Sequence, residues 1–240
     1  MTAETSNGKV TKWLGNLALL ALVLLPVSVL MVRGGLWQQG LAMYALSCLT
    51  AAILLLVFVI ILLLPRTAGK RRPVAMRSLM VIPGTLLFLS VATTGGNYPA
   101  IHDITTDVAN PPVFTQAPLL RGASANSLDI NEETLQSQLQ AYPDLAPLES
   151  PLAFEAAFAK ALQTAEALGW SISSSDPKKG LIEAIDTTAV MAFKDDIVIR
   201  IWAQENTSRI DLRSVSRVGV SDMGANVKRI RHFIERFKTE

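Results

Sequence analysis

The sequence predicts a membrane-anchored α+β protein, in which three N-terminal transmembrane helices precede an antiparallel sheet of about four strands covered by two helices. Two observations support this fold class. Hydrophobic residues make up 50% of the 240-residue chain and are concentrated before Gly95, in runs long enough to cross a bilayer. The rest of the chain contains short strand-like runs between two segments that have the period of amphipathic helices.

These observations divide the chain into three parts. We expect a transmembrane anchor at 1–94, an extended, Pro-rich arm at 95–150, and an α+β core at 151–240. The arm and the core together form one soluble domain, whose size is typical of independently folding domains.

The anchor contains three apolar runs, with helices expected at about 13–32, 41–64 and 78–94. At ~1.5 Å per residue, the first two are long enough for a ~30 Å hydrocarbon core. The third is shorter and contains Pro83, so whether it crosses the bilayer completely stays open at this point. No cleavage site of small residues follows the first run, and we therefore expect an anchor rather than a signal peptide.

Basic residues set the expected orientation of the anchor. The segment PRTAGKRRPVAMR, between the second and third runs, contains five Lys/Arg and no acid, and such segments stay in the cytoplasm. We therefore expect a cytoplasmic N-terminus and, after three crossings, a C-terminal domain outside the cytoplasm. If 78–94 only dips into the bilayer, the domain is cytoplasmic instead.

Charge and cysteine content exclude several classes of protein. Residues 1–94 contain eight Lys/Arg and one acid, a net charge of +7, which leaves 14 basic and 19 acidic residues, a net charge of −5, for 95–240. An acidic soluble domain argues against a nucleic-acid partner. The only cysteine, Cys48, excludes an intrachain disulfide and a thiolate zinc site.

The soluble domain has clear signals for its helices. Prolines preclude long helices in the arm, where we expect one short helix at about 131–140. A helix at 151–168 is predicted by Ser150 as N-cap and by Gly169 at the C′ position. A closing helix at about 225–238 has one apolar face, and its other face is expected to be basic and solvated: Lys228, Arg229, Arg231 and Arg236.

Four strands are expected between these helices, at 170–174, 181–188, 196–203 and 209–218. Charge selects the register of the last two, if residues 204–207 form a four-residue loop. Ile201 then faces Ile210, and Arg200 faces Asp211, whereas a shift by two residues would place Arg200 opposite another arginine. In this register Trp202 faces Arg209, and we expect a cation–π contact between them.

One candidate binding site includes polar residues on and after these strands. It consists of Arg200, Asp211, Arg213, Arg217, Asp222 and Asn226. Arginines that share one face of a strand can bind phosphate or carboxylate bidentately, which indicates an anion or lipid-headgroup site. Alternatively, the same residues form an ion-pair ladder with acids of the sheet and the arm.

A second candidate site lies at the start of the arm. His102, Asp103 and Asp107 are close enough in sequence to ligate a divalent metal or to act as an acid–base pair. The other interpretation is that the two aspartates cap turns. The sequence contains no P-loop, dinucleotide fingerprint or nucleophile elbow, so we assign no catalytic residue and expect no cofactor.

The segments AIHDITTDVANPPVF, FKDDIVIRI and SRIDLRSVSRVGVSDMGANVKRIRHFI carry a family resemblance. Over roughly 98–237 the chain resembles the bacterial family known as domain of unknown function 1499. The resemblance implies a membrane-anchored or secreted bacterial protein and no established activity. Together with the predicted orientation of the anchor, we expect a multi-pass protein of the bacterial inner (cytoplasmic) membrane whose C-terminal domain is periplasmic.

The function that we expect is therefore non-enzymatic. The domain would bind an anionic ligand, a lipid or a partner protein at the cell envelope, with the lipid bilayer as its permanent partner. The alternative is an envelope hydrolase or metal-dependent enzyme that uses His102, Asp103 and Asp107.

Overall fold

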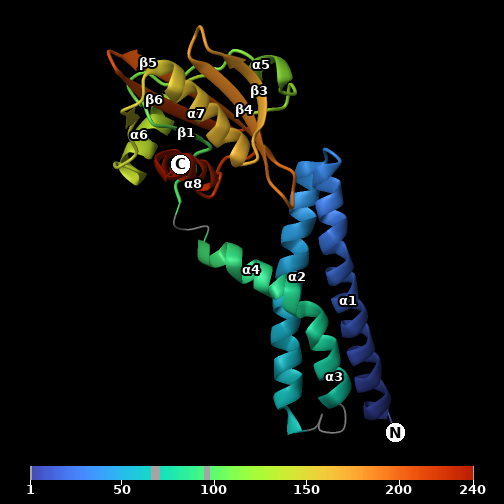
Figure 1. Cartoon of the computed structure of the whole chain (residues 1–240). Helices are drawn as coiled ribbons and strands as arrows, with labels where there is room; N and C mark the ends of the chain where they lie inside the picture. The colour runs from blue at the N-terminus through green and yellow to red at the C-terminus, as the bar shows by residue number, and fades with distance from the viewer. Residues whose placement is uncertain (1, 66–70, 95–97, 240) are drawn as a thin grey trace. The chain divides into compact units, whose positions relative to one another are not determined.

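The computed structural model describes residues 2–65, 71–94 and 98–239. The chain forms two compact units, Met1–Gly96 and Asn97–Glu240, which are shown together in Figure 1. Each unit has its own buried core, and each is described by itself.

The first unit is helical. It contains α1 (Thr2–Arg33), α2 (Trp37–Leu63), α3 (Arg71–Ser78), the 3₁₀ turn η2 (Leu79–Val81) and α4 (Ile82–Thr94). Three of its stretches are long and apolar enough to cross a membrane: Lys9–Arg33, Trp37–Leu63 and Arg71–Thr93. The three predicted transmembrane helices are thus confirmed in number and character.

The third of these stretches is longer than the predicted helix at 78–94. It begins at Arg71, because the basic residues before Ser78 continue the helix although they lower the hydropathy. Pro73 is tolerated there because it lies in the first turn, where no backbone donor is needed. The resulting 23 residues follow a path of about 35 Å at 1.5 Å per residue, but they do not form one straight helix, because η2 separates α3 from α4 and α4 turns away from the direction of α3 (Figure 1).

Small residues allow these helices to approach one another closely. Gly84 of α4 lies so near Ala51 of α2 that a Cβ at Gly84 would collide with it. Phe58 and Val74 are fully buried in the same cluster. Close contact at small residues is typical of helix packing in membranes.

The second unit contains one antiparallel sheet with strand order β1-β6-β5-β4-β3, in which β2 also pairs with β6. The strands are β1 (Asp103–Thr105), β2 (Leu148–Ser150), β3 (Ser171–Asp176), β4 (Leu181–Thr187), β5 (Lys194–Gln204) and β6 (Thr207–Ser216). The α+β fold class is confirmed, but the sheet has six strands rather than about four. The two additional strands belong to the arm and are only three residues long, too short for an alternating pattern to be recognised.

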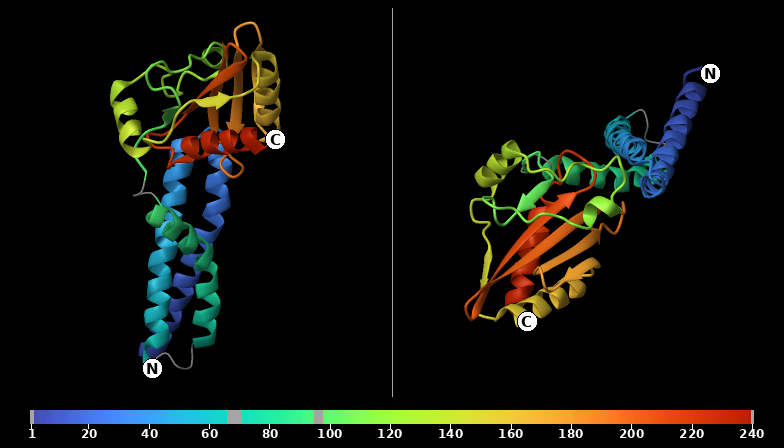
Figure 2. Two further views of the ribbon diagram at one scale, coloured as in Figure 1. Left: turned by 60° about the vertical axis from the view of Figure 1, so that its left-hand side comes forward. Right: turned by 90° about the horizontal axis from the view of Figure 1, so that it is seen from above.

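Two helices and the arm cover opposite faces of this sheet (Figure 2). The helices of this unit are α5 (Ala117–Leu120), α6 (Glu132–Ala141), α7 (Phe154–Ala167) and α8 (Ala225–Thr239). Against α7 and α8, the main core includes Ile199, Leu212 and Phe233. On the other face, Phe114 of the arm packs against Val198 and neighbouring apolar residues.

The start of α7 differs from the prediction. The helix begins at Phe154 and not at 151, because Ser150 belongs to β2, where its hydroxyl accepts a hydrogen bond from the amide of Leu152. Its end is as predicted, since Gly169 adopts a left-handed φ of 81° directly after the helix. The short helix of the arm is also confirmed, with Asn131 as its N-cap.

The predicted register of the β5–β6 hairpin is confirmed residue by residue. Ile201 pairs with Ile210, Arg200 with Asp211, and Trp202 with Arg209. The loop is tighter than predicted, because Gln204 pairs with Thr207. The cation over the Trp202 ring is Arg200, 4.7 Å away, and not Arg209, because the Trp202 indole turns to donate a hydrogen bond to Asp211.

Candidate functional site

Asp211 is at the centre of a charged cluster on the arm-side face of the sheet. Its side chain is fully buried, and its two oxygens accept hydrogen bonds from Arg200 at 2.7 and 3.0 Å, from Arg209 at 3.1 Å, and from the Trp202 indole at 2.7 Å. The hydrogen bond to Asp211 raises the pKa of the Arg209 guanidinium. Asp107 of the arm accepts from the same two arginines at 3.3 and 2.9 Å. Two strands and the arm are thus joined through two carboxylates.

Arg213 lies on β6, two residues after Asp211, and is 1% exposed. Its guanidinium binds Asp103 bidentately at 3.0 and 2.7 Å. It also donates to the carbonyl oxygens of Pro112 and Leu128, and it lies 5.4 Å from the centre of the Phe114 ring. All of these partners of Arg213 belong to the arm, so this side chain holds the arm on the sheet.

Arg217 and Arg121 share one carboxylate at the end of the same face. Arg217 binds Asp196 bidentately at 3.0 and 2.7 Å. Nε of Arg121 lies 3.0 Å from Asp196, close enough for an ion pair but without the geometry of a hydrogen bond. Burial lowers the pKa of Arg121, because its guanidinium is desolvated.

A second polar cluster lies under α8, on the opposite face of the sheet. Asn226 is fully buried, donates to the His102 carbonyl and the Ser216 hydroxyl at 3.0 Å, and accepts from the Ser214 hydroxyl at 2.7 Å. Asp222 caps the start of α8 by accepting from the amides of Gly224 and Asn226 at 2.8 and 2.9 Å.

The prediction that Arg229 lies on a solvated basic face of α8 is wrong. It is buried rather than solvated, and it forms ion pairs with Asp186 and Asp195 at the end of the sheet. The amphipathic pattern failed here because an arginine can be buried wherever carboxylates face it, and the sequence period does not show where those carboxylates lie.

The six residues of the first predicted site therefore belong to two clusters on opposite faces of the sheet. Arg200, Asp211, Arg213 and Arg217 lie under the arm, whereas Asp222 and Asn226 lie at the start of α8. The ion-pair ladder that the sequence offered as an alternative is present on the arm side. Ligand binding by these six residues stays a prediction.

His102, Asp103 and Asp107 point to different partners. The His102 ring is 3.3 Å from the Val220 carbonyl oxygen, while Asp103 and Asp107 bind different arginines. Asp107 also caps a turn by accepting from the Asn110 amide at 3.0 Å, as the turn interpretation predicted. Among the residues that the structure describes, no three His, Cys, Asp or Glu side chains are grouped to hold a metal.

Glu183 was missed by the sequence reasoning. It is 1% exposed on β4, and its carboxylate accepts from the amides of Thr115, Gln116 and Ala117 at the start of α5. The signal was an acid within the apolar run LIEAI, because a buried carboxylate requires partners. Glu183 therefore fixes a third point of the arm.

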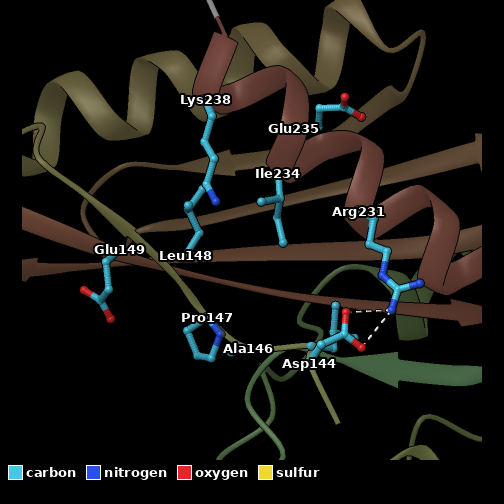
Figure 3. A pocket seen from close by; sticks show the side chains of 10 residues that line it. Asp144, Ala146, Pro147, Leu148, Glu149, Arg231, Ile234, Glu235 and Lys238 are labelled. Atoms are coloured by element: carbon cyan, nitrogen blue, oxygen red, sulfur yellow. Dashed lines mark hydrogen bonds and ion pairs between the residues drawn. The ribbon is translucent and has the colours of Figure 1, made fainter. Parts of the chain in front are cut away.

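An open groove lies between α8 and the segment 144–149, which we call the strap. It has a volume of about 690 Å³. Its apolar lining includes Leu148, Pro147 and Ile234 (Figure 3). At one end Asp144 and Arg231 face each other at 2.8 Å. Glu149, Glu235 and Lys238 complete the charged rim.

The rim differs from the buried clusters in its exposure. The side chains of Asp144 and Arg231 are 66% and 48% exposed, so this ion pair exchanges readily with water or a ligand. Apart from this pair, two carboxylates face one ammonium group, which leaves the groove with a net charge of −1.

Comparison with known proteins supports the family resemblance. Residues 103–237, more than half of the chain, match the model of a family described as "Protein of unknown function (DUF1499)". No curated protein matches the chain. The matched residues begin at β1 and end in α8, so they include the sheet, the arm from Asp103 onwards and the charged side chains of both clusters. The chain belongs to the DUF1499 family.

Proposed function

We propose that the chain is a membrane-tethered, non-enzymatic domain outside the cytoplasm, which binds a partner protein at the cell envelope through the groove between α8 and the strap. The observation on which this rests is the contrast between the groove and the buried clusters. The arginines and aspartates of the clusters bind one another, whereas the groove presents apolar and charged side chains to solvent.

The groove favours a particular kind of occupant. Pro147 and Ile234 offer apolar surface for one or two apolar side chains, and Glu149 and Glu235 offer carboxylates for a lysine or arginine beside them. Such a combination of apolar lining and charged rim is the general anatomy of a protein-binding surface. A partner segment with alternating basic and apolar residues fits it best.

The location outside the cytoplasm is supported by the anchor. Three spans would put the two ends of the anchor on opposite sides of a membrane, and the five basic residues before the third apolar run favour a cytoplasmic loop there. Alkaline phosphatase fused after the last residue should be active in bacterial cells. A green fluorescent protein fused at the same place should be dark, and bright cytoplasmic fluorescence would refute the location.

Site-specific photocrosslinking in native membranes tests the groove. A photoreactive amino acid replaces Ala146, which is exposed on the strap, or Ala123, which is exposed elsewhere on the arm, in the full chain. We expect a discrete adduct only from position 146. Glu235→Lys should reduce its yield several-fold, whereas Glu155→Lys, on an exposed part of α7, should not. Identical adducts from both positions, or no effect of Glu235→Lys, would exclude the groove as the binding surface.

A further inference from the structure

One end of the soluble domain is formed by three segments that are distant in sequence. Residues 98–102 precede β1, whose Asp103 pairs with Val215. The loop 188–193 follows β4 and precedes β5, and 218–224 follows β6. Because Asp195 pairs with Ser216, both loops leave the sheet at the end where the chain enters the domain. We call these three segments the tether end.

Direct contacts join two segments of the tether end, 98–102 and 218–224. The Ser221 hydroxyl donates to the Pro99 carbonyl at 3.3 Å, and the Asp222 amide donates to the Ile101 carbonyl at 3.0 Å. Gly224 lies directly against the Tyr98 ring, where a Cβ would collide with it. The loop 218–224 therefore lies beside the first residues of the domain.

The loops of the tether end expose apolar side chains. Val220 is 74% exposed, Val190 62% and Met223 37%. Met223 is held in a left-handed conformation with φ of 52°, which is costly for a residue with a Cβ. Each apolar side chain occurs on a loop, where solvent-exposed polar residues are usual.

The charges of the tether end differ from those of the whole domain. The loop 188–193 has no charged residue, and the only acid in 218–224, Asp222, caps α8. Lys194 and Lys228 are exposed beside the loops, and Lys228 lies 4.7 Å from the centre of the Tyr98 ring. The local charge is thus positive in a domain whose net charge is −5.

The short covalent connection between α4 and Tyr98 limits how far the tether end can lie from the end of the anchor. Only residues 95–97 separate Thr94, the last residue of α4, from Tyr98. Four peptide units span at most about 14 Å, so Tyr98 stays within that distance of the end of a membrane-spanning stretch. Apolar side chains, an aromatic ring and flanking lysines are the composition of interfacial anchors.

We infer that the tether end rests on the lipid surface, with Val190, Val220 and Met223 inserted among the headgroups and with Lys194 and Lys228 beside lipid phosphates. Docking there fixes the orientation of the domain, so that its opposite end, with the β5–β6 turn, points away from the bilayer. This inference holds for either side of the membrane, so it does not depend on the proposed function.

Depth measurements on the full chain in lipid nanodiscs test this inference. Cys48→Ala removes the only cysteine, and an environment-sensitive fluorophore is attached through Val190→Cys, Val220→Cys or, as control, Asn206→Cys in the β5–β6 turn. The nanodiscs contain phosphatidylethanolamine and phosphatidylglycerol. We expect the labels at 190 and 220 to be quenched by brominated lipid and to have a several-fold lower iodide quenching constant than the label at 206.

Two results would overturn the inference. Equal iodide quenching at positions 190, 206 and 220 would mean that the tether end lies in water. Protection of 190 and 220 from iodide without quenching by brominated lipid would mean that protein and not lipid covers them. Circular dichroism and melting of each labelled variant check that the fold is retained.

Discussion

At the scale of single residues, the soluble domain is unusual for the number of charges that it buries. Asp211, Arg213, Glu183 and Asp196 are each at most 1% exposed. Burying a charge is costly unless an opposite charge or hydrogen bonds compensate it. Asp211, Arg213 and Asp196 have ion-pair partners, and Glu183 accepts hydrogen bonds from backbone amides of the arm. Removing one partner should therefore destabilise the domain far more than removing a surface charge.

Asp211→Asn tests this expectation. It removes the buried one of the two carboxylates that Arg200 and Arg209 share and should lower the free energy of unfolding by about 3 kcal/mol or more. The matched control is Asp144→Asn, which breaks an exposed ion pair and should change it by at most about 1 kcal/mol. Chemical unfolding of both variants, followed by tryptophan fluorescence, measures the difference. Similar losses in the two variants would contradict a central role for Asp211.

Tyr142 gives a pH-dependent expectation. Burial, together with the charge of Asp222, raises the pKa of its phenol above the unfolded value of about 10. The folded state thus holds this proton more tightly than the unfolded state does. The resulting contribution to the free energy of unfolding is complete below pH ~10, and it is lost as the pH rises towards the pKa of the folded state.

The Tyr142→Phe variant has no proton to lose at this position. Its free energy of unfolding relative to the wild type should be constant up to pH ~9 and should increase above pH ~10. Denaturant titrations of both proteins at each pH measure this difference, in which the titration of lysines cancels. A difference that is independent of pH would show that Tyr142 ionises equally in both states.

At the scale of elements, the sequence predicted what depends on local pattern. The β5–β6 register followed from charge and alternation, because a shift by two residues would place Arg200 opposite another arginine and an odd shift would turn the apolar side chains to solvent. The end of α7 followed from Gly169. Contacts that depend on distant segments were not predictable: β1 and β2 form only because β6 offers an edge, and the burial of Arg229 requires two carboxylates from other strands.

Substitutions at two glycines distinguish the energetic cost of a left-handed backbone conformation from the cost of a steric collision. Gly169 and Gly180 both have positive φ, 81° and 65°, but a Cβ at Gly169 meets open space, whereas at Gly180 it would collide with the Ile201 carbonyl oxygen. Gly169→Ala should cost about 1–2 kcal/mol from the left-handed conformation alone. Gly180→Ala should cost more, because β5 must also move. Thermal melting compares the two, and equal melting temperatures would contradict the collision.

At the scale of the whole molecule, the candidate binding surface was the least predictable feature. The strap and α8 are distant in sequence, and the sequence indicates no binding motif in either. The sequence directed attention to the arginines of β6, which the fold uses for its own contacts. Charged side chains that could bind a ligand can equally form ion pairs with one another. Which of the two they do depends on the path of the arm, and the sequence alone does not show that path.

The soluble unit has a complete core of its own, with Ile199, Leu212 and Phe233 fully buried. We therefore expect residues 98–239, produced without the anchor, to fold and to melt cooperatively as a monomer. Circular dichroism and calorimetry measure this. A domain that stays unfolded without residues 1–97 would show that the anchor takes part in folding.

The arm is synthesised before the strands to which its aspartates bind. Asp103 binds Arg213, which is 110 positions later in the chain, and Asp107 binds Arg200 and Arg209, which are 93 and 102 positions later. A nascent chain that ends before β5 and β6 has no counterions for these carboxylates, so its arm cannot close on the sheet. Closure of the arm thus requires that synthesis has passed β6, and chains that terminate earlier should be cut by proteases that leave the complete domain intact.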